Sequence, residues 1–154
     1  MPDIFETVVV CVINGYAEVS GRRTKVFLIG KRRSDIEGPG AGQWHIPGGR
    51  LLFGETEKIA AMRMAREKTD LSTIAKSCIA TSTSQRLLPD GMTKHDQQKW
   101  FDLEVLPNSE QAKAGSDLAE IRWVTGNTVR RFVTDDVVDT WPAEIYSFLG
   151  IWPE

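Results

Sequence analysis

The side chains best suited to chemistry in this sequence are cations around a glycine-rich stretch. Arg32 and Arg33 lie near the start of residues 30–49, which are rich in Gly, Pro and charge, and Arg50 follows directly. Guanidinium groups bind phosphate through paired N–H donors. A connection of this length within a compact domain is usually functional. The pattern favours phosphate binding by these arginines, and solvated loop charges are the alternative.

A lysine has an unusual place in the one long helix that the sequence predicts, residues 55–68. Glu55 falls in its first turn and Lys68 in its last, as the helix dipole favours. At 100° per residue Lys68 also projects onto the apolar stripe, which comprises Ala60, Ala61, Met64, Ala65 and Leu71. A charge there costs desolvation energy unless it reaches a cleft or a partner. We expect Lys68 to contact a phosphate, and a solvated lysine at the helix end is the alternative.

Strands must position this helix and the glycine-rich stretch. Residues 43–46 predict a brief strand, after which Pro47 and two glycines break regular structure. A second helix is expected at residues 143–149. Apolar runs or polar–apolar alternation predict strands elsewhere, at residues 8–13, 25–29, 79–85, 100–106 and 121–124. The sequence thus predicts one domain, residues 1–154, of the α+β class, with a mixed sheet between helices.

The segment from Gly42 to Leu71 resembles the signature of the Nudix superfamily. Gly49, five residues, Glu55, seven residues and Arg63 follow its spacing without a gap. Other positions that match the family's usual surroundings are Trp44, Pro47, Gly48, Gly54 and Thr56. Two branches look most similar, the GDP-mannose mannosyl hydrolases and the small nucleoside-triphosphate pyrophosphatases.

The resemblance spans about residues 6–150 and implies the Nudix fold, an α/β/α sandwich with a mixed β-sheet, the signature helix and a C-terminal helix. It implies hydrolysis, in which water attacks a phosphate-containing bond of a nucleoside diphosphate linked to another group. It also implies a magnesium site, since Mg²⁺ prefers oxygen ligands. On this basis we expect one Mg²⁺ or Mn²⁺ ion on Glu67, Glu55 and the Gly48 carbonyl, with Glu67 and Glu55 as catalytic residues. In the family the position of Glu55 also caps the helix and contacts the arginine at the position of Arg63.

The helix departs from the signature where the metal ligands should be. Met64 and Lys68 stand where the pattern has Glu, and Asp70 stands where it has Gly. A thioether is a poor ligand for a hard cation, and an ammonium repels one. The usual cluster of two or three metal ions is therefore not expected in this degenerate Nudix box.

Two functions of different classes remain open. One is a Nudix-type hydrolase of a nucleotide or nucleotide sugar, cleaving a phosphoanhydride or glycosyl bond with a reduced ligand set. Its substrate contacts would come from Arg32, Arg33, Arg50 and Lys68. The other is a catalytically impaired nucleotide-binding module that lost the metals and kept the cleft. A purely structural role is a third reading.

Weaker candidates lie outside the signature. His95 and Asp96, expected in a polar loop, could supply a general base if that loop reaches the site. Trp44 and Trp100 could stack on a base, although core packing is favoured.

The composition limits the classes of partner that we expect for this chain. The chain has 154 residues, 41 % apolar and 26 % charged, with a net charge of −2, so it is globular and offers no basic field for a nucleic acid polymer. It lacks an apolar run of membrane-spanning length and a signal-like N-terminus, so we expect a cytoplasmic protein. Cys11 and Cys78 are expected as reduced core residues. A homodimer is one expected assembly.

Overall fold

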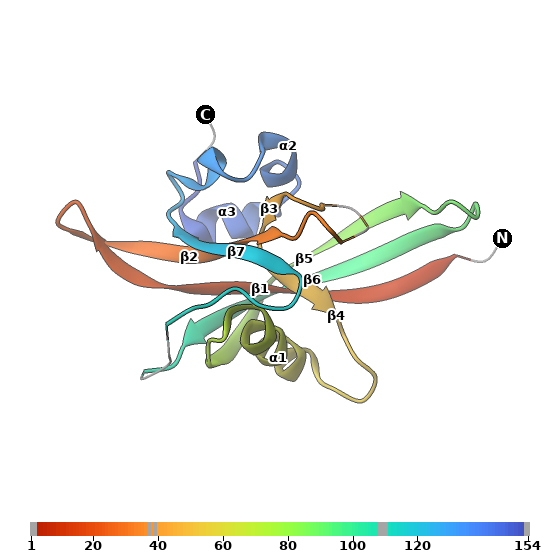
Figure 1. Ribbon diagram of the computed structural model, residues 1–154, viewed down its shortest axis with the longest axis horizontal. Helices are drawn as coiled ribbons and strands as arrows, with labels where there is room; N and C mark the ends of the chain where they lie inside the picture. Colours follow the sequence, from red (N-terminus) through yellow and green to blue (C-terminus); the bar gives the residue numbers. More distant parts are fainter. Residues whose placement is uncertain (1–2, 37, 39, 108–110, 153–154) are drawn as a thin grey trace.

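Helices cover both faces of a mixed β-sheet in the computed structural model, which describes residues 3–36, 38, 40–107 and 111–152. Helix α1 (Glu57–Thr69) lies against one face, and α2 (Asp135–Val138) and α3 (Ala143–Leu149) lie on the other side (Figure 1). The α+β sandwich that the sequence predicted is therefore confirmed.

The sheet is built around strand β1, which pairs with three other strands. The described strands are β1 (Ile4–Val19), β2 (Arg22–Arg32), β3 (Trp44–His45), β4 (Gly48–Arg50), β5 (Thr73–Leu87), β6 (Thr93–Val105) and β7 (Leu118–Val124). Their order is β3-β2-β1-β6-β5, with β4 also paired to β1 and β7 to β2. The β1–β6 pairing is parallel and the others are antiparallel, which makes the sheet mixed as predicted.

Alternation along β1 divides the core between the two faces of the sheet. Successive side chains of a strand point to opposite faces. Val9, Cys11 and Ile13 pack in the cluster that contains α1, whereas Val10 and Val12 pack in the cluster that contains α3. The α1 cluster includes the fully buried alanines 60, 61 and 65. These small side chains let α1 lie close to the sheet, as its apolar stripe predicted.

Helix α1 has a specific residue at each end. Thr56 is the N-cap, and its Oγ1 accepts a hydrogen bond from the backbone N–H of Ile59 at 3.2 Å. Asp70 is the C-cap and has φ 60°, in the left-handed region that usually favours glycine. Its N–H donates to the Arg66 carbonyl. Asp70 therefore takes the backbone role that the signature gives to glycine.

Several elements differ from their predicted extent. The strands predicted at residues 8–13, 25–29, 79–85, 100–106 and 121–124 all begin earlier in the structure. The short helical segments at residues 129–131 and 135–138 were not predicted. The prediction that Pro47 and the glycines break regular structure was wrong at β4, where Gly48 and Gly49 pair with Val10 and Val9.

The close approach of β4 to β1 explains why glycine can occupy a strand here. A Cβ on Gly48 would come within 2.8 Å of the Val9 carbonyl oxygen, too close for any other residue without a shift. Glycine is read as a strand breaker in sequence, but in β4 it is what the tight packing requires.

The two cysteines differ in burial. Cys11 is fully buried, and burial raises the pKa of its thiol to about 12, so it stays protonated. Cys78 is exposed, so the prediction that both are core residues was wrong for Cys78. Within the described part of the chain, no helix is long and apolar enough to cross a membrane.

Candidate functional site

Arg63 joins the two predicted catalytic carboxylates. Its Nη2 and Nε donate to Glu55 at 2.7 and 3.0 Å, and its Nη1 donates to Glu67 at 3.1 Å. Glu55 also accepts from the backbone N–H of Leu52 at 2.8 Å. The hydrogen bonds from Arg63, and to a lesser extent the one from the Leu52 backbone, hold the pKa of Glu55 below its usual value. The Glu67 side chain is about half exposed, at 52 %, and is the accessible carboxylate of the pair.

Lys68 is buried between α1 and β4. Its ammonium donates to the Gly48 carbonyl at 2.7 Å and lies 2.9 Å from a carboxylate oxygen of Asp117. Its side chain is 10 % exposed. The prediction that Lys68 leaves the solvated helix surface and reaches a partner is thus matched by its position, but its partners are protein groups. The Gly48 carbonyl, which we expected to bind a metal ion, accepts a hydrogen bond from Lys68 in this structure.

Asp117 is the counter-charge of Lys68, and it was not among the residues singled out from the sequence. Burial raises the pKa of its carboxyl, but Lys68, a backbone hydrogen bond and His45 together lower it further, so the pKa lies below the ordinary value. Asp117 directly precedes β7, and its backbone carbonyl accepts from the N–H of Arg33 at 2.8 Å. The Arg32 Nε lies 3.9 Å from the other carboxylate oxygen. The only sequence signal was the turn-forming triplet Gly115-Ser116-Asp117 before a strand.

Met64 fills the space where the signature has its first metal-binding carboxylate. The side chain is buried, and its sulfur lies 3.3 Å from where a Cβ of Gly49 would be. It belongs to the apolar cluster beneath α1. Met64 therefore packs in the core and offers the site no oxygen ligand.

A pocket of about 330 Å³ lies beside β4. Its lining includes Gly48, Gly49, Arg50, Lys94, Trp100 and Trp141. The two tryptophan rings meet edge to face with centroids 6.2 Å apart. Pockets of this size with apolar walls and few polar groups are the usual form of small-molecule sites. Trp100 is buried in the core as predicted, and it also contributes to this pocket.

The cations of this pocket are partly neutralised. Lys94, itself buried, lies 3.1 Å from Glu6 and 3.4 Å from Asp96. The Arg50 guanidinium, 69 % exposed, lies 3.2 Å from Glu6. Arg50 also touches the carboxylate cluster through its backbone, because its carbonyl accepts from Arg63 at 3.3 Å. Arg50 thus connects the pocket with the Glu55–Arg63–Glu67 cluster.

The two arginines near the start of the glycine-rich stretch separate in the structure. Arg32 lies beside Asp117 and so belongs to the surroundings of Lys68. Arg33 turns to its own loop, where it holds Asp35 with two hydrogen bonds of 3.0 and 2.6 Å. The structure therefore brings together Arg32, Lys68 and Gly48, and links Glu55, Glu67 and Arg50 through Arg63. It leaves Arg33 outside both groups.

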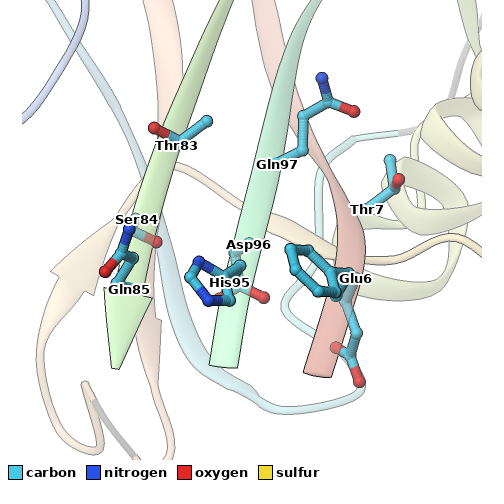
Figure 2. A pocket seen from close by; sticks show the side chains of 9 residues that line it. Glu6, Thr7, Thr83, Ser84, Gln85, His95, Asp96 and Gln97 are labelled. Atoms are coloured by element: carbon cyan, nitrogen blue, oxygen red, sulfur yellow. The ribbon is translucent and has the colours of Figure 1, made fainter. Parts of the chain in front are cut away.

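His95 and Asp96 lie in strand β6, so the expected polar loop was wrong. They line a second pocket formed at the ends of β1, β5 and β6, with Glu6 and Thr7 on one side (Figure 2). The His95 ring stacks on Phe5 at 4.7 Å, and its Nε2 lies 3.0 Å from Asp3. Phe5 and Asp3 are thus the neighbours that fix the His95 ring.

The donor set does not fit the family's cluster of two or three metal ions. Within the residues that the structure describes, no group of three or more His, Cys, Asp or Glu side chains could hold an ion. Glu55 and Glu67 are bound to Arg63, and the Gly48 carbonyl is bound to Lys68. A single ion on Glu67, Glu55 and Gly48 stays a prediction in which Lys68 competes for the carbonyl.

Comparisons with known proteins bear on the family and the fold. The family model described as NUDIX domain matches residues 7–144. No curated protein matched the sequence significantly. Among solved structures, the MutT protein of Methanosarcina mazei Go1 superposes with a TM-score of 0.67 at 19 % identity, covering 97 % of this chain and 94 % of its own.

Two further structures share this fold. A mutT/nudix family protein from Listeria innocua has a TM-score of 0.67 at 21 % identity, covering 94 % of both chains. A C. elegans Ap4A hydrolase has a TM-score of 0.57 at 19 % identity, covering 94 % of this chain and 93 % of its own. At these identities the structures show a common fold.

Proposed function

This chain belongs to the NUDIX domain family, and from that premise we propose that it hydrolyses a nucleoside-diphosphate-linked compound, a nucleotide or a nucleotide sugar. The bond cleaved would be a phosphoanhydride or a glycosyl bond. The similarity to an Ap4A hydrolase supports the nucleotide class, since that protein is named for a dinucleoside polyphosphate.

The observation that carries the proposal is the pocket beside β4. Trp100 and Trp141 give it aromatic edges for a base, and Arg50 and Lys94 give it cations for phosphate groups. Gly48 and Gly49 also line it, and the backbone carbonyl of Arg50 accepts a hydrogen bond from Arg63 of the carboxylate cluster. A base in this pocket would place its phosphates between Arg50 and Glu67.

The roles of the site residues follow from their exposure and contacts. We propose Glu67 as the catalytic carboxylate, because it is half exposed and fixed by Arg63. Glu55 is then a positioning residue that orients Arg63 from the other side. Arg50 lines the pocket and would bind a phosphate group, whereas Arg32 lies beside Asp117 and Arg33 is held by Asp35. Glu67, together with phosphate oxygens of the substrate, would hold Mg²⁺ or Mn²⁺, which would supply neutralisation of the phosphate charge.

The test is a chromatographic turnover screen with the purified protein. The panel comprises nucleoside diphosphates, triphosphates, nucleotide sugars and dinucleoside polyphosphates, each with Mg²⁺, Mn²⁺ or chelator. We expect metal-dependent cleavage of at least one compound. We also expect Glu67→Gln to lower kcat by about a hundredfold or more, with stability changed by less than about 1 kcal/mol, because its ion pair is exposed.

Glu104→Gln is the matched control. Glu104 is also an exposed carboxylate in an ion pair, with Lys76 at 3.5 Å, and it lies in β6 away from the site. This variant should keep wild-type turnover. Equal turnover in the Glu67 and Glu104 variants would remove Glu67 from the reaction.

A second function, a nucleotide-binding module without catalysis, is favoured by one observation. The Gly48 carbonyl and Lys68 already satisfy each other, so this part of the site has the charge balance of a binding site without an ion. Binding of a nucleotide by the folded protein, with no turnover on any compound, would favour this function over hydrolysis.

A further inference from the structure

We propose that Gln98 selects the base of the nucleotide, because its amide presents an N–H donor to the pocket beside β4. This donor favours a base with an oxo group, guanine or uracil, over a base with an amino group, adenine or cytosine. The inference rests on the proposed function in taking a nucleotide as the ligand of this pocket. It does not require that any bond be cleaved.

A relay of two hydrogen bonds fixes the orientation of the Gln98 amide. The indole Nε1 of Trp100 donates to the Ser82 Oγ at 3.0 Å, and the Ser82 Oγ lies 2.6 Å from the Gln98 Oε1. An indole N–H can only donate, so the Ser82 oxygen accepts there and its own hydrogen is left for Gln98. The separation of 2.6 Å is typical of an O–H···O bond and short for an N–H···O bond. The amide oxygen of Gln98 therefore faces Ser82, and the amide nitrogen faces the other way.

The amide nitrogen of Gln98 is a donor without a protein partner. Within the residues that the structure describes, no acceptor takes a hydrogen bond from this nitrogen. It is also not among the buried polar atoms that lack a partner, so it is open to solvent. Gln98 lines the pocket beside β4, where the nitrogen can meet a ligand. Its N–H groups are therefore available to an acceptor atom of that ligand.

Gln98 lies at the aromatic end of the pocket. It comes two residues before Trp100 on β6, so both side chains point to the same face of the sheet. Arg50 lies across β1 from Gln98, because both residues pair with Val8. Two strand spacings make this separation about 10 Å, which leaves room for a ribose between a base at Gln98 and phosphate groups at Arg50. The group that meets Gln98 is therefore expected on the base.

An N–H donor at this place discriminates between bases. Guanine has an oxo oxygen where adenine has an amino group, and uracil, like thymine, has one where cytosine has an amino group. The oxo oxygen accepts from the Gln98 amide, whereas an amino group would put two donors against each other. A site that hydrogen-bonds one ligand group rejects an analogue without it, because the polar group of the site is left unpaired.

Thr140 gives the same pocket an acceptor. Its hydroxyl donates to the Val137 carbonyl at 2.7 Å, so its oxygen is left to accept a hydrogen bond. Guanine and uracil carry a ring N–H next to the oxo group, whereas adenine and cytosine have a bare ring nitrogen there. A pocket with one donor and one acceptor thus matches the oxo bases.

The experiment measures nucleotide affinity and not turnover. Calorimetry with GDP, ADP, UDP and CDP, in Mg²⁺ and again in chelator, gives two pairs whose members have the same ring size. Of each pair that binds, the wild-type protein should bind the oxo member at least about tenfold more tightly. Gln98→Met keeps the side-chain length and removes the donor, so this ratio should fall toward one.

Two further variants sharpen the test. Gln98→Glu replaces the N–H by an acceptor oxygen, so the ratio should fall further and favour the amino bases. The ratio is unaffected by the added negative charge, which weakens all four nucleotides alike. Ser82→Ala removes the group that orients the amide and should lower the ratio by a smaller factor, whereas general damage to the fold would weaken the four nucleotides equally.

Gln97→Met is the matched control. Gln97 is the preceding residue of β6, and its side chain points to the opposite face, where it lines the pocket of Figure 2. This variant should keep the wild-type ratio. A change in it equal to that of Gln98→Met would count against the inference.

The inference is overturned if the wild type shows no preference within either pair, or if Gln98→Met keeps the wild-type ratio. If the Gln98 variants fail to fold, an unchanged ratio in folded Ser82→Ala overturns it instead. Failure to bind any of the four compounds would refute this inference and the nucleotide class of the proposed function together. Selective binding without turnover would refute hydrolysis alone, and turnover without base preference would refute this inference alone.

Discussion

Glu67 and Lys68 are neighbours in the chain, yet their side chains lie in opposite surroundings. A step of about 100° around a helix turns Glu67 toward Arg63 at the surface and Lys68 toward Gly48 in the interior. The apolar stripe of the sequence predicted that Lys68 would not be solvated. It could not predict Asp117, because a counter-charge from a segment almost fifty residues away carries no periodic signal.

His45 provides a residue-level prediction about pH. Burial lowers its pKa below 6.5, and the nearby Lys68 adds to this effect. The unfolded chain therefore binds a proton at a higher pH than the folded chain, so stability is lost as pH falls below about 6.5. Denaturant unfolding at pH 7.5, 6.5 and 5.5 should show this loss in the wild type and a smaller one in His45→Gln.

The other histidine is the control for this measurement. His95→Gln leaves His45 in place and should retain the loss of stability between pH 6.5 and 5.5. An identical pH dependence in the wild type and His45→Gln would show that His45 is not the group responsible.

At the level of elements, α1 depends on its N-cap residue, Thr56. Thr56 satisfies an N–H that the helix cannot satisfy itself. Thr56→Ala should lower the free energy of unfolding by about 1 kcal/mol, measured by chemical denaturation. Thr56→Ser keeps the hydroxyl and should stay near the wild type. Equal losses in both variants would assign the effect to the lost methyl group instead.

The elements whose sequence signals are most local were predicted most accurately. Helix α3 matches its predicted range, and α1 differs by two residues at its start and one at its end. Strand cores were found, but their ends were not, because β5 and β6 extend through polar residues held by cross-strand pairing. Strand β4 was missed because its glycines are dictated by the approach of β1, which is a tertiary constraint.

At the level of the whole molecule, the segment after β7 closes the core on the α3 side. Its apolar residues, among them Val129, Val133, Val138 and Ile145, pack on β1 and β2. The closure has one tight point, where Gly126 meets the end of α3. A Cβ on Gly126 would collide with the Gly150 carbonyl and come within 2.7 Å of the Leu149 carbonyl.

This tight point gives a prediction for global stability. Gly126→Ala must push the end of α3 outward and should cost about 1–3 kcal/mol, seen as a lower midpoint of thermal unfolding. Gly15→Ala is the control, since Gly15 lies in β1 with no atom within 4 Å of an added Cβ. An unchanged midpoint for Gly126→Ala would show that the contact between the turn after β7 and α3 is not needed for closure.

The parallel pairing of β1 with β6 also sets the order of events when the chain is made. Ile4 to Asn14 pair with Lys94 to Glu104, so the central strand has to wait for a partner ninety residues later. At about 5–20 residues per second, that wait is roughly 5 to 20 seconds of synthesis. During this wait the apolar run Val8–Ile13 has already been made, but the strand that covers its edge has not. During its synthesis this protein therefore depends on its surroundings to keep that run from pairing with another chain.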